Sequence, residues 1–381
     1  SRTERARALV PMLVLFVGYV AIHRGMGFGS YASNVYVDPA REPGAWLELA
    51  AMRVPILVAD MFLAIPTGKL ALYPELMKVQ AVLGPAALLL VGLLVPGVWR
   101  RLEGKARRRL LWLMLAAVLA ILPVASSFVS ARLLLIPAVG GHAVVAAIVL
   151  DGWDRVRDRG QWTKVMTWIR GVLSAALLSA HVGLASWWGL EELLNINRLN
   201  EGTRQAALMM QVDDAKVPQQ RLVVLTAADP MTLLYPALVR WVEGHPLPRS
   251  WWVLSLAPRP HTLTRVADDA LEMEVVMGSM LTGPVELLFR RPEFPFAEGD
   301  LVELEGLSIR ILKVDGDGRP VRVRYRFDVP VDDPSLVFLL ATKRGLIRYP
   351  IGPVKATMPI PPAMLPLVLD LEAQDRAAAG P

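Results

Sequence analysis

The sequence contains no cysteine, and this absence removes several kinds of chemistry. A chain without thiols has no disulfides, no thiolate nucleophile and no cysteine-ligated zinc. Histidines number only 5, and charged residues make up 20% of the chain. No glycine-rich phosphate loop accompanies a predicted strand, which argues against a nucleotide site. We therefore predict neither a metal site nor a cofactor.

Long apolar runs are missing as well, but only from the second half. Residues 8–189 carry five such runs separated by basic clusters, whereas residues 190–381 carry none. A run of about 18 apolar residues is long enough to cross a bilayer as a helix. The mean hydropathy of +0.41 and the hydrophobic content of 54% agree with a membrane protein. The sequence predicts a transmembrane helical domain at 1–190 and a water-soluble region after it.

The basic clusters set the expected orientation, because Lys and Arg gather at the cytoplasmic ends of spans. Such clusters precede the first span and follow the second and the fourth. The N-terminus is then cytoplasmic, and the C-terminal region is extracytoplasmic. The composition, rich in Ala, Arg, Leu and Pro, fits a GC-rich bacterium, so we expect the bacterial inner membrane. The five predicted spans lie at 9–22, 79–99, 110–124, 133–150 and 166–190.

A further apolar stretch at 46–66 is harder to place. It contains Glu48, Arg53 and Asp60, a costly set of charges for a helix that faces lipid. A crossing here would also prevent both downstream basic loops from being cytoplasmic. We predict an interfacial or re-entrant helix on the outer face. The alternative is a sixth span that is buried in the helix bundle.

Three side chains at membrane depth are candidates for function. His142 follows Gly140 and Gly141 in the fourth span, and His181 lies midway along the fifth. Each histidine either relays protons or hydrogen-bonds a neighbouring helix, while the glycines allow close helix packing. Arg132 lies at the outer end of the fourth span, against the cytoplasmic bias of basic residues. It either holds a phosphate through its planar fork of donors or extends to the interface as an ordinary arginine.

Residues 130–141 read SARLLLIPAVGG and resemble a motif of polytopic glycosyltransferases of the GT-C class. In the protein O-mannosyltransferase-like branch, an Arg-Tyr-Leu-Tyr-x-Pro-like stretch opens a late membrane helix on the outer side. Leu133 and Leu135 stand here where that pattern has tyrosines. Residues 27–43, GFGSYASNVYVDPAREP, resemble the outer loop of bacterial membrane proteins with this layout, in which further spans come first. The chain thus resembles the C-terminal portion of such a protein, and because it begins with Ser1 we expect residues upstream.

The resemblance covers roughly residues 8–190 and implies a reaction. A sugar would pass, with inversion, from a polyprenyl-phosphate donor to an acceptor on the outer face. An acidic base would activate the acceptor hydroxyl, and a cation would stabilise the leaving phosphate. Arg132 is carried over as the candidate contact to the lipid phosphate. The family has a catalytic acid in its first outer loop, and Asp38 before Pro39 is the candidate here, although it does not match the family's acidic pair.

The second half is predicted to be mainly β. Residues 191–249 indicate a helical connector and a short α/β element, and residues 250–358 alternate short strands with turns. The Asp-Gly turn at 315–318 is a strong hairpin signal. This pattern is typical of an antiparallel sandwich or barrel. Residues 359–381, rich in Pro and Ala, are predicted to be a docking or disordered tail.

Three functions remain open from the sequence, and whether the chain is an enzyme is one of the open points. The first is part of a GT-C-like glycosyltransferase, with membrane lipid and a polyprenyl-phosphate sugar as partners. The second is a non-catalytic subunit that packs on other membrane subunits and binds a partner through its β-domain. The third, a transporter or lipid-flipping component, is disfavoured because no inverted repeat is visible. The net charge of +6 comes largely from short loops between spans, so we expect no nucleic-acid partner.

Overall fold

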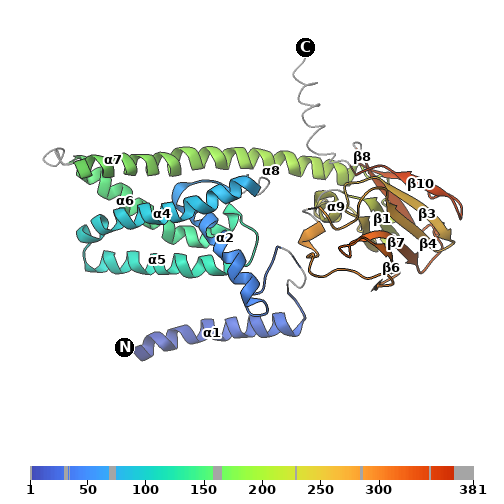
Figure 1. Ribbon diagram of the computed structural model, residues 1–381, viewed down its shortest axis with the longest axis horizontal. Helices are drawn as coiled ribbons and strands as arrows, with labels where there is room; N and C mark the ends of the chain where they lie inside the picture. The colour runs from blue at the N-terminus through green and yellow to red at the C-terminus, as the bar shows by residue number, and fades with distance from the viewer. Residues whose placement is uncertain are drawn as a thin grey trace, which may run out of the picture. The chain divides into compact units, whose positions relative to one another are not determined.

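The computed structural model describes residues 2–29, 33, 35–67, 74–157, 165–227, 230–283, 286–342 and 345–363. The chain divides into two compact units, Ser1–Leu190 and Glu191–Pro381. The first unit is helical and the second is mostly β (Figure 1). Each unit has its own buried core and is described by itself.

Four stretches among the described residues are helical, long and apolar enough to cross a membrane: Arg7–Gly25, Met77–Arg101, Ala131–Arg157 and Thr167–Gln205. They overlap four of the five predicted spans, although the last continues to Gln205, past the predicted end at 190. The remaining one, at 110–124, is also helical, but its short apolar part follows a basic stretch and it is not among these four. The elements of the helical unit are α1 (Arg2–Gly25), α2 (Pro43–Leu63), α4 (Pro74–Arg101), α5 (Gly104–Val124), the 3-10 turn η1 (Ala131–Leu134), α6 (Leu135–Arg157), α7 (Val165–Leu178), the π-helical η3 (Ser179–Leu184) and the start of α8 (Ala185–Leu208).

Glycines decide how closely these helices approach one another. A Cβ on Gly84 of α4 would overlap the backbone carbonyl of Pro55 in α2. A Cβ on Gly140 of α6 would overlap the backbone of α5, and one on Gly141 would overlap the Met61 side chain of α2. The prediction that Gly140 and Gly141 allow close helix packing is confirmed.

α2 covers the stretch for which the sequence left two interpretations open. Its second half is buried against α4 and α6. Arg53 is buried too, and its Nη1 donates to the carbonyl of Ala125 over 3.0 Å, which offsets part of the cost of burying the guanidinium. Such burial is the feature expected of the alternative interpretation, a helix inside the bundle. The buried apolar side chains are Ala50, Ile56, Leu57, Val58, Ala59, Met61 and Phe62.

A buried carboxylate joins three helices at another place in this unit. Asp151 of α6 lies 2.8 Å from Nε of Arg155, 3.3 Å from Nε of Arg101 in α4 and 3.4 Å from Nη1 of Arg170 in α7. Gly97 of α4 leaves the space that the Arg170 guanidinium occupies. Because an unpaired charge in an interior is expensive, this network holds the three helix ends together.

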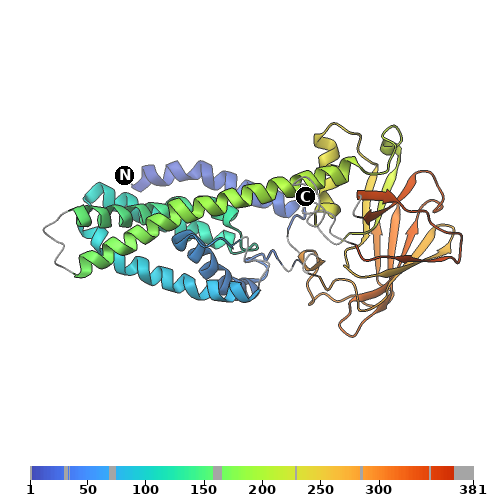
Figure 2. The same cartoon turned by 90° about the horizontal axis from the view of Figure 1, so that it is seen from above.

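The β unit contains two sheets, drawn from yellow to red in Figure 2. One has six antiparallel strands in the order β10-β3-β4-β7-β6-β5, and the other has four in the order β2-β1-β8-β9. The elements are η4 (Val217–Gln219), β1 (Arg221–Thr226), α9 (Pro230–Val242), β2 (Ser250–Ser255), β3 (His261–Ala267), β4 (Ala270–Val275), η5 (Glu286–Leu288), β5 (Leu301–Leu304), β6 (Leu307–Val314), β7 (Pro320–Phe327), β8 (Leu336–Thr342), β9 (Gly345–Arg348) and β10 (Thr357–Ile360).

The antiparallel prediction holds for the six-stranded sheet and fails for most of the other. β1 pairs in parallel with both β2 and β8, and only β8 and β9 are antiparallel. Parallel neighbours need a crossover connection, which α9 supplies between β1 and β2. β1 lies in the connector region predicted at 191–249. It nevertheless shares a sheet with β2, β8 and β9, which lie in the β region predicted at 250–358. β10 reaches Ile360, inside the predicted tail, and residues 364–381 of that tail lie outside the described residues.

The two sheets pack face to face. Val223 and Leu225 of β1 join the core shared with the six-stranded sheet, while the alternate residues Leu222 and Val224 fill a second core on the other face. β1 is consequently buried on both sides, which explains why its sequence is continuously apolar. The hydroxyl of Tyr325 in β7 donates to a β2 carbonyl over 2.6 Å and connects the layers, and its burial raises the pKa of that phenol.

The helix contacts predict that Gly84→Ala lowers the free energy of unfolding of the helical unit by about 1–3 kcal/mol, because the added methyl group meets a backbone atom that cannot move aside. Gly92→Ala in the same helix is the control, since nothing lies near its Cβ position. It should be neutral or stabilising by up to about 1 kcal/mol. Unfolding in detergent measures both, and equal effects would contradict the close packing of α2 on α4.

The β unit should lose stability in mildly acid solution because of His261. This side chain is 1% exposed, and burial lowers its pKa to about 4. An unfolded histidine has a pKa of about 6.5, so between these values only the unfolded chain binds the proton. Stability should therefore fall as the pH drops from about 6.5 to about 4, by up to about 3 kcal/mol, and this contribution should not fall further below that.

His261→Gln provides the comparison, because carboxylates also change the stability at low pH. Denaturant unfolding of both proteins, at several values between about pH 7 and about pH 4, gives the two slopes. The variant should show the shallower dependence. Parallel curves would mean that His261 is not the responsible group.

Candidate functional site

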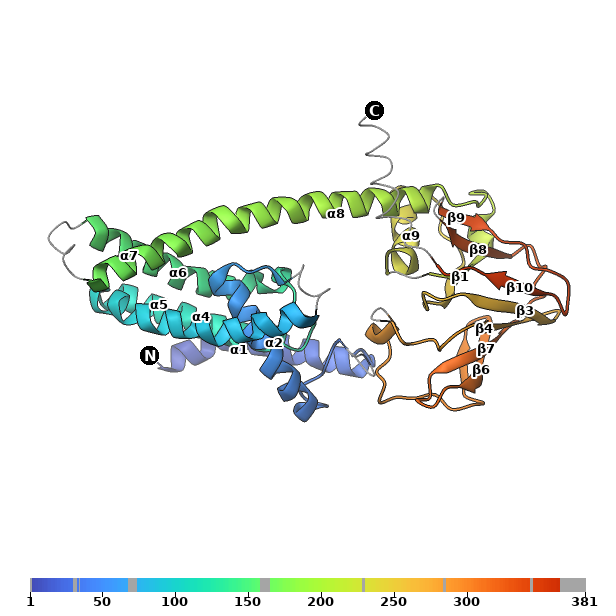
Figure 3. The ribbon, with the colours of Figure 1, turned by 45° about the horizontal axis from the view of Figure 1, so that its top comes forward.

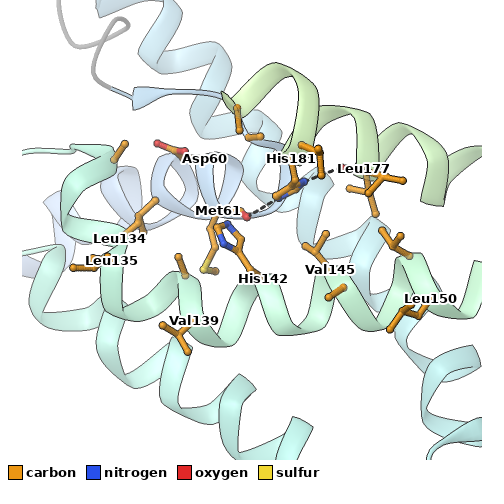
Figure 4. A pocket seen from close by; sticks show the side chains of 18 residues that line it. Asp60, Met61, Leu134, Leu135, Val139, His142, Val145, Leu150, Leu177 and His181 are labelled. Atoms are coloured by element: carbon orange, nitrogen blue, oxygen red, sulfur yellow. Dashed lines mark hydrogen bonds between the residues drawn. The ribbon is translucent and has the colours of Figure 1, made fainter. Parts of the chain in front are cut away.

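A cavity of about 810 Å³ lies within the helical unit (Figure 4). It is bounded by α2, η1, α6 and the continuous helical stretch from α7 into α8. Nearly all of its lining is apolar, and the polar side chains among the lining residues are Asp60, His142 and His181. A largely apolar space with a few polar groups is typical of a ligand site.

The sequence of α6 explains why a space remains here. Ala138, His142 and Ala146 recur at intervals of four, so they lie on one face of the helix and all line the cavity. Alanines leave room where leucines would fill it. On the other side the π-helical segment Ser179–Leu184 carries His181, and such segments alter the direction of the side chains that follow them.

The cavity opens through an apolar rim. Leu135, Val139, Leu150 and Val182 line it and are each more than half exposed at the surface of the unit. Apolar side chains around an opening disfavour water. The opening therefore suits a ligand with a hydrocarbon part.

His181 is held between two backbone carbonyls. Its Nδ1 lies 3.0 Å from the oxygen of Leu177, and its Nε2 lies 3.3 Å from the oxygen of Met61 in α2. Carbonyl oxygens only accept, so a neutral ring can donate to one of them and a protonated ring to both. Both contacts are drawn as dashed lines in Figure 4. His181 thereby links the fifth predicted span to α2.

His142 packs against His181 but is bonded differently. The two rings meet edge to face with their centroids 5.3 Å apart. Within the described ranges no hydrogen-bond partner reaches either nitrogen of His142, and its side chain is exposed. Nearby, Asp60 accepts from the backbone N–H and the hydroxyl of Thr67, each over 3.0 Å. Of the three polar groups, His142 is thus the one available to a ligand.

Arg132 lies on η1, the turn that forms one wall of the cavity. Its neighbours Ala131 and Leu134 line the cavity, whereas Arg132 itself is exposed. Its guanidinium lies 5.2 Å from the ring centroid of Phe128, a cation–π contact. Among the residues that the structure describes, no carboxylate pairs with it. The cation therefore remains available beside an apolar space.

Asp38, the candidate acid, lies away from this cavity. Its carboxylate is 2.9 Å from Nη2 of Arg24 and 3.9 Å from Nε of Arg41. It also accepts from the backbone N–H of Ala40 over 2.9 Å, which closes a turn. These contacts give it a structural role in the loop. Within the described ranges, no group of three or more His, Asp and Glu side chains could hold a metal ion.

The sequence singles out two of these polar groups as functional candidates, separately, and does not single out the third. His142 and His181 were named as residues of different spans, and the structure brings them into one cavity. Asp60 was noted as a cost to the stretch at 46–66 and not as a neighbour of the histidines. An acidic residue in an otherwise apolar helix was the available signal for it.

Comparison with known proteins does not place the chain in a family. No family model, curated protein or solved structure matches it. The resemblance to GT-C glycosyltransferases therefore stays a prediction. The function has to be argued from the geometry of the cavity and its surroundings.

The two histidines should respond differently to substitution. His181→Leu removes the hydrogen bond that joins α7–α8 to α2, and we expect a loss of about 1 kcal/mol in the stability of the helical unit. His142→Leu removes no such bond and should change stability little. Thermal unfolding in detergent measures both, and a larger loss for His142→Leu would contradict the hydrogen bonding described here.

Proposed function

We propose that the helical unit lies in a bacterial inner membrane and binds a lipid that carries a phosphate headgroup. The N-terminus is then cytoplasmic and the β unit extracytoplasmic, as the basic clusters predict. One observation carries the proposal: an exposed arginine, which has no carboxylate partner among the described residues, stands on the same turn that lines an apolar cavity. The two features match the two ends of a lipid phosphate.

Each end of the ligand has a physical partner. The Arg132 guanidinium offers a planar fork of donors to two phosphate oxygens, and charge-assisted hydrogen bonds of this kind are stronger than neutral ones. The hydrocarbon chain enters the cavity through its apolar rim, which removes apolar surface from polar surroundings. His142 supplies a further hydrogen-bonding group part of the way along the cavity.

A polyprenyl-phosphate sugar is the ligand that the GT-C resemblance favours. The cavity supports the binding of such a donor. Transfer of the sugar needs a free base, and neither described candidate is free: Asp38 is engaged by two arginines and Asp60 by Thr67. Sugar transfer therefore stays a prediction of the resemblance, separate from lipid binding.

A second candidate function is that of a non-catalytic subunit, and the edge strand β5 favours it. All four of its residues are exposed, including Leu301, Val302 and Leu304. An apolar strand at a sheet edge is open to pairing with a strand of another chain. In this candidate the phosphate of a lipid is not recognised, so substitution of Arg132 distinguishes the two functions.

The lipid proposal predicts that Arg132→Ala weakens binding of a polyprenyl phosphate by about tenfold to a hundredfold, the loss expected for hydrogen bonds to a charged group. Arg132→Lys should retain part of the affinity, because it keeps the charge and loses the fork. Native mass spectrometry of the purified chain with added polyprenyl phosphate measures the bound fraction. The unaltered chain should bind the corresponding polyprenol, which lacks the phosphate, more weakly than it binds the polyprenyl phosphate. The polyprenol itself should bind equally to the unaltered chain and to the two Arg132 variants.

Arg100→Ala is the matched control, since Arg100 is an exposed arginine at the end of α4 and away from the cavity. It should bind both lipids as the unaltered chain does. The proposal is wrong if the unaltered chain does not prefer the phosphate over the alcohol. It is also wrong if the Arg132 and Arg100 variants lose the same affinity.

A further inference from the structure

Three arginines converge on one buried carboxylate at one end of the helical unit. The Asp151 carboxylate lies within 3.4 Å of all of them: Arg101 of α4, Arg155 of α6 and Arg170 of α7. A second carboxylate, that of Asp154, lies 4.0 Å from Arg101 and is exposed. Figure 3 shows that α4 and α6 end, and α7 begins, at the same end of the unit. The cluster therefore carries more positive than negative charge.

The three guanidinium groups are not equivalent. Arg155 and Arg170 both donate to Oδ2 of Asp151, and each side chain is less than a fifth exposed. Arg101 is 37% exposed, and its Nε lies 3.3 Å from Oδ1 of Asp151. That oxygen accepts no hydrogen bond from any described residue. Arg101 is thus held near the cluster by charge, and its planar fork of donors can still bind a second anion.

The cluster lies where the apolar parts of three candidate spans stop. One span ends at Arg101, the next ends at Arg157, and the last begins at Thr167. Trp153 and Trp168, at the same helix ends, are both exposed. Tryptophan is enriched where membrane and water meet, because its ring combines an apolar body with a polar N–H. This end of the unit therefore has the composition of a surface at headgroup level.

Arg132 lies at the opposite end of α6. It precedes this helix, whereas Arg155 lies in the last turn. The 23 residues of α6 form a helix about 35 Å long, slightly more than the hydrocarbon core of a bilayer, which is about 30 Å thick. In a membrane the two arginines would therefore meet opposite leaflets. A lipid bound at the cluster is not the lipid bound at the cavity.

We propose that Arg101 binds the phosphate of an anionic phospholipid from the cytoplasmic leaflet, while Arg155 and Arg170 strengthen the positive potential around it. The proposal rests on the membrane placement and orientation proposed above and does not depend on a ligand in the cavity. Anionic lipids give the cytoplasmic leaflet a negative surface potential, which complements the surplus of arginine. Lipid, rather than an acidic protein, is the occupant because the cluster is level with exposed tryptophans and with the ends of apolar spans.

Phosphatidylglycerol, which is anionic, tests the proposal against phosphatidylcholine, which has the same phosphate and no net charge. Native mass spectrometry of the purified full chain measures the bound fraction of each. Arg101→Gln should weaken binding of phosphatidylglycerol about tenfold or more, the loss expected for hydrogen bonds to a charged group. Phosphatidylcholine should bind the unaltered chain more weakly and should be less affected by the substitution.

Arg100→Gln is the matched control, since Arg100 is the exposed neighbour of Arg101 and carries the same charge. It should retain most of the affinity. The unaltered chain and both variants are prepared with and without Arg132→Ala, so that a phospholipid bound at the cavity is counted separately. The site is overturned if the two phospholipids bind alike. It is also overturned if both glutamine variants lose the same affinity, as a diffuse field of charge would produce.

Thermal unfolding separates lipid binding from a structural role. In lipid-free detergent, Arg101→Gln should lower the unfolding temperature less than Arg155→Gln, which loses a hydrogen bond to Asp151. Phosphatidylglycerol should raise the unfolding temperature of the unaltered chain more than that of Arg101→Gln. Equal losses without lipid, together with equal gains from lipid, would assign Arg101 to the Asp151 network alone and overturn the site. Release of the chain from membranes by alkaline carbonate, without detergent, would instead overturn the membrane placement on which the site rests.

Discussion

The helical unit depends on the close approach of α2 to its neighbours. Gly84 and Gly141 lack the side chains that would keep α2 away from α4 and α6, so Pro55 and Met61 come against their backbones. Helices surrounded by lipid gain little from hydrophobic association, and close packing with small residues is the main attraction left to them. The same approach brings the Met61 carbonyl within 3.3 Å of His181. The position of α2 thus determines one wall of the cavity and the bonding of a histidine inside it.

The cations of this unit differ in whether they have a polar partner, and this difference singles out Arg132. Asp151 and its arginines pair with one another in a network around the buried carboxylate, and Arg53 donates to a carbonyl. Arg132, in contrast, has an aromatic ring beside it and no carboxylate partner among the described residues. Arg132 is exposed, so it carries no burial cost, and its guanidinium is accessible to an anion beside the apolar cavity. A lipid phosphate, the proposed ligand, would combine such an anion with an apolar chain.

Local patterns in the sequence predicted local structure well. Apolar runs gave the helices, turn residues separated the strands, and the pair Gly140 and Gly141 indicated close packing. Periodicity does not say which strands pair, so the parallel neighbours of β1 were not foreseen. Nor does it say that His142 and His181, from different helices, share a cavity with Asp60. The burial of Arg240 in α9 is matched by Asp214, which precedes the helix by more than one element, and no local pattern contains that contact.

The rim of the cavity limits which ligands can reach it. A polar molecule arriving from water would have to pass Leu135, Val139 and Val182, all exposed at the opening, and would lose its hydration there without compensation. A lipid that is already in the bilayer loses nothing, because its chain moves from one apolar environment to another. Its headgroup keeps the interfacial position at which Arg132 is proposed to lie. Under the proposed function, entry from within the membrane would select for amphipathic molecules before any specific contact forms, and Arg132 would have only to distinguish an anionic headgroup from a neutral one.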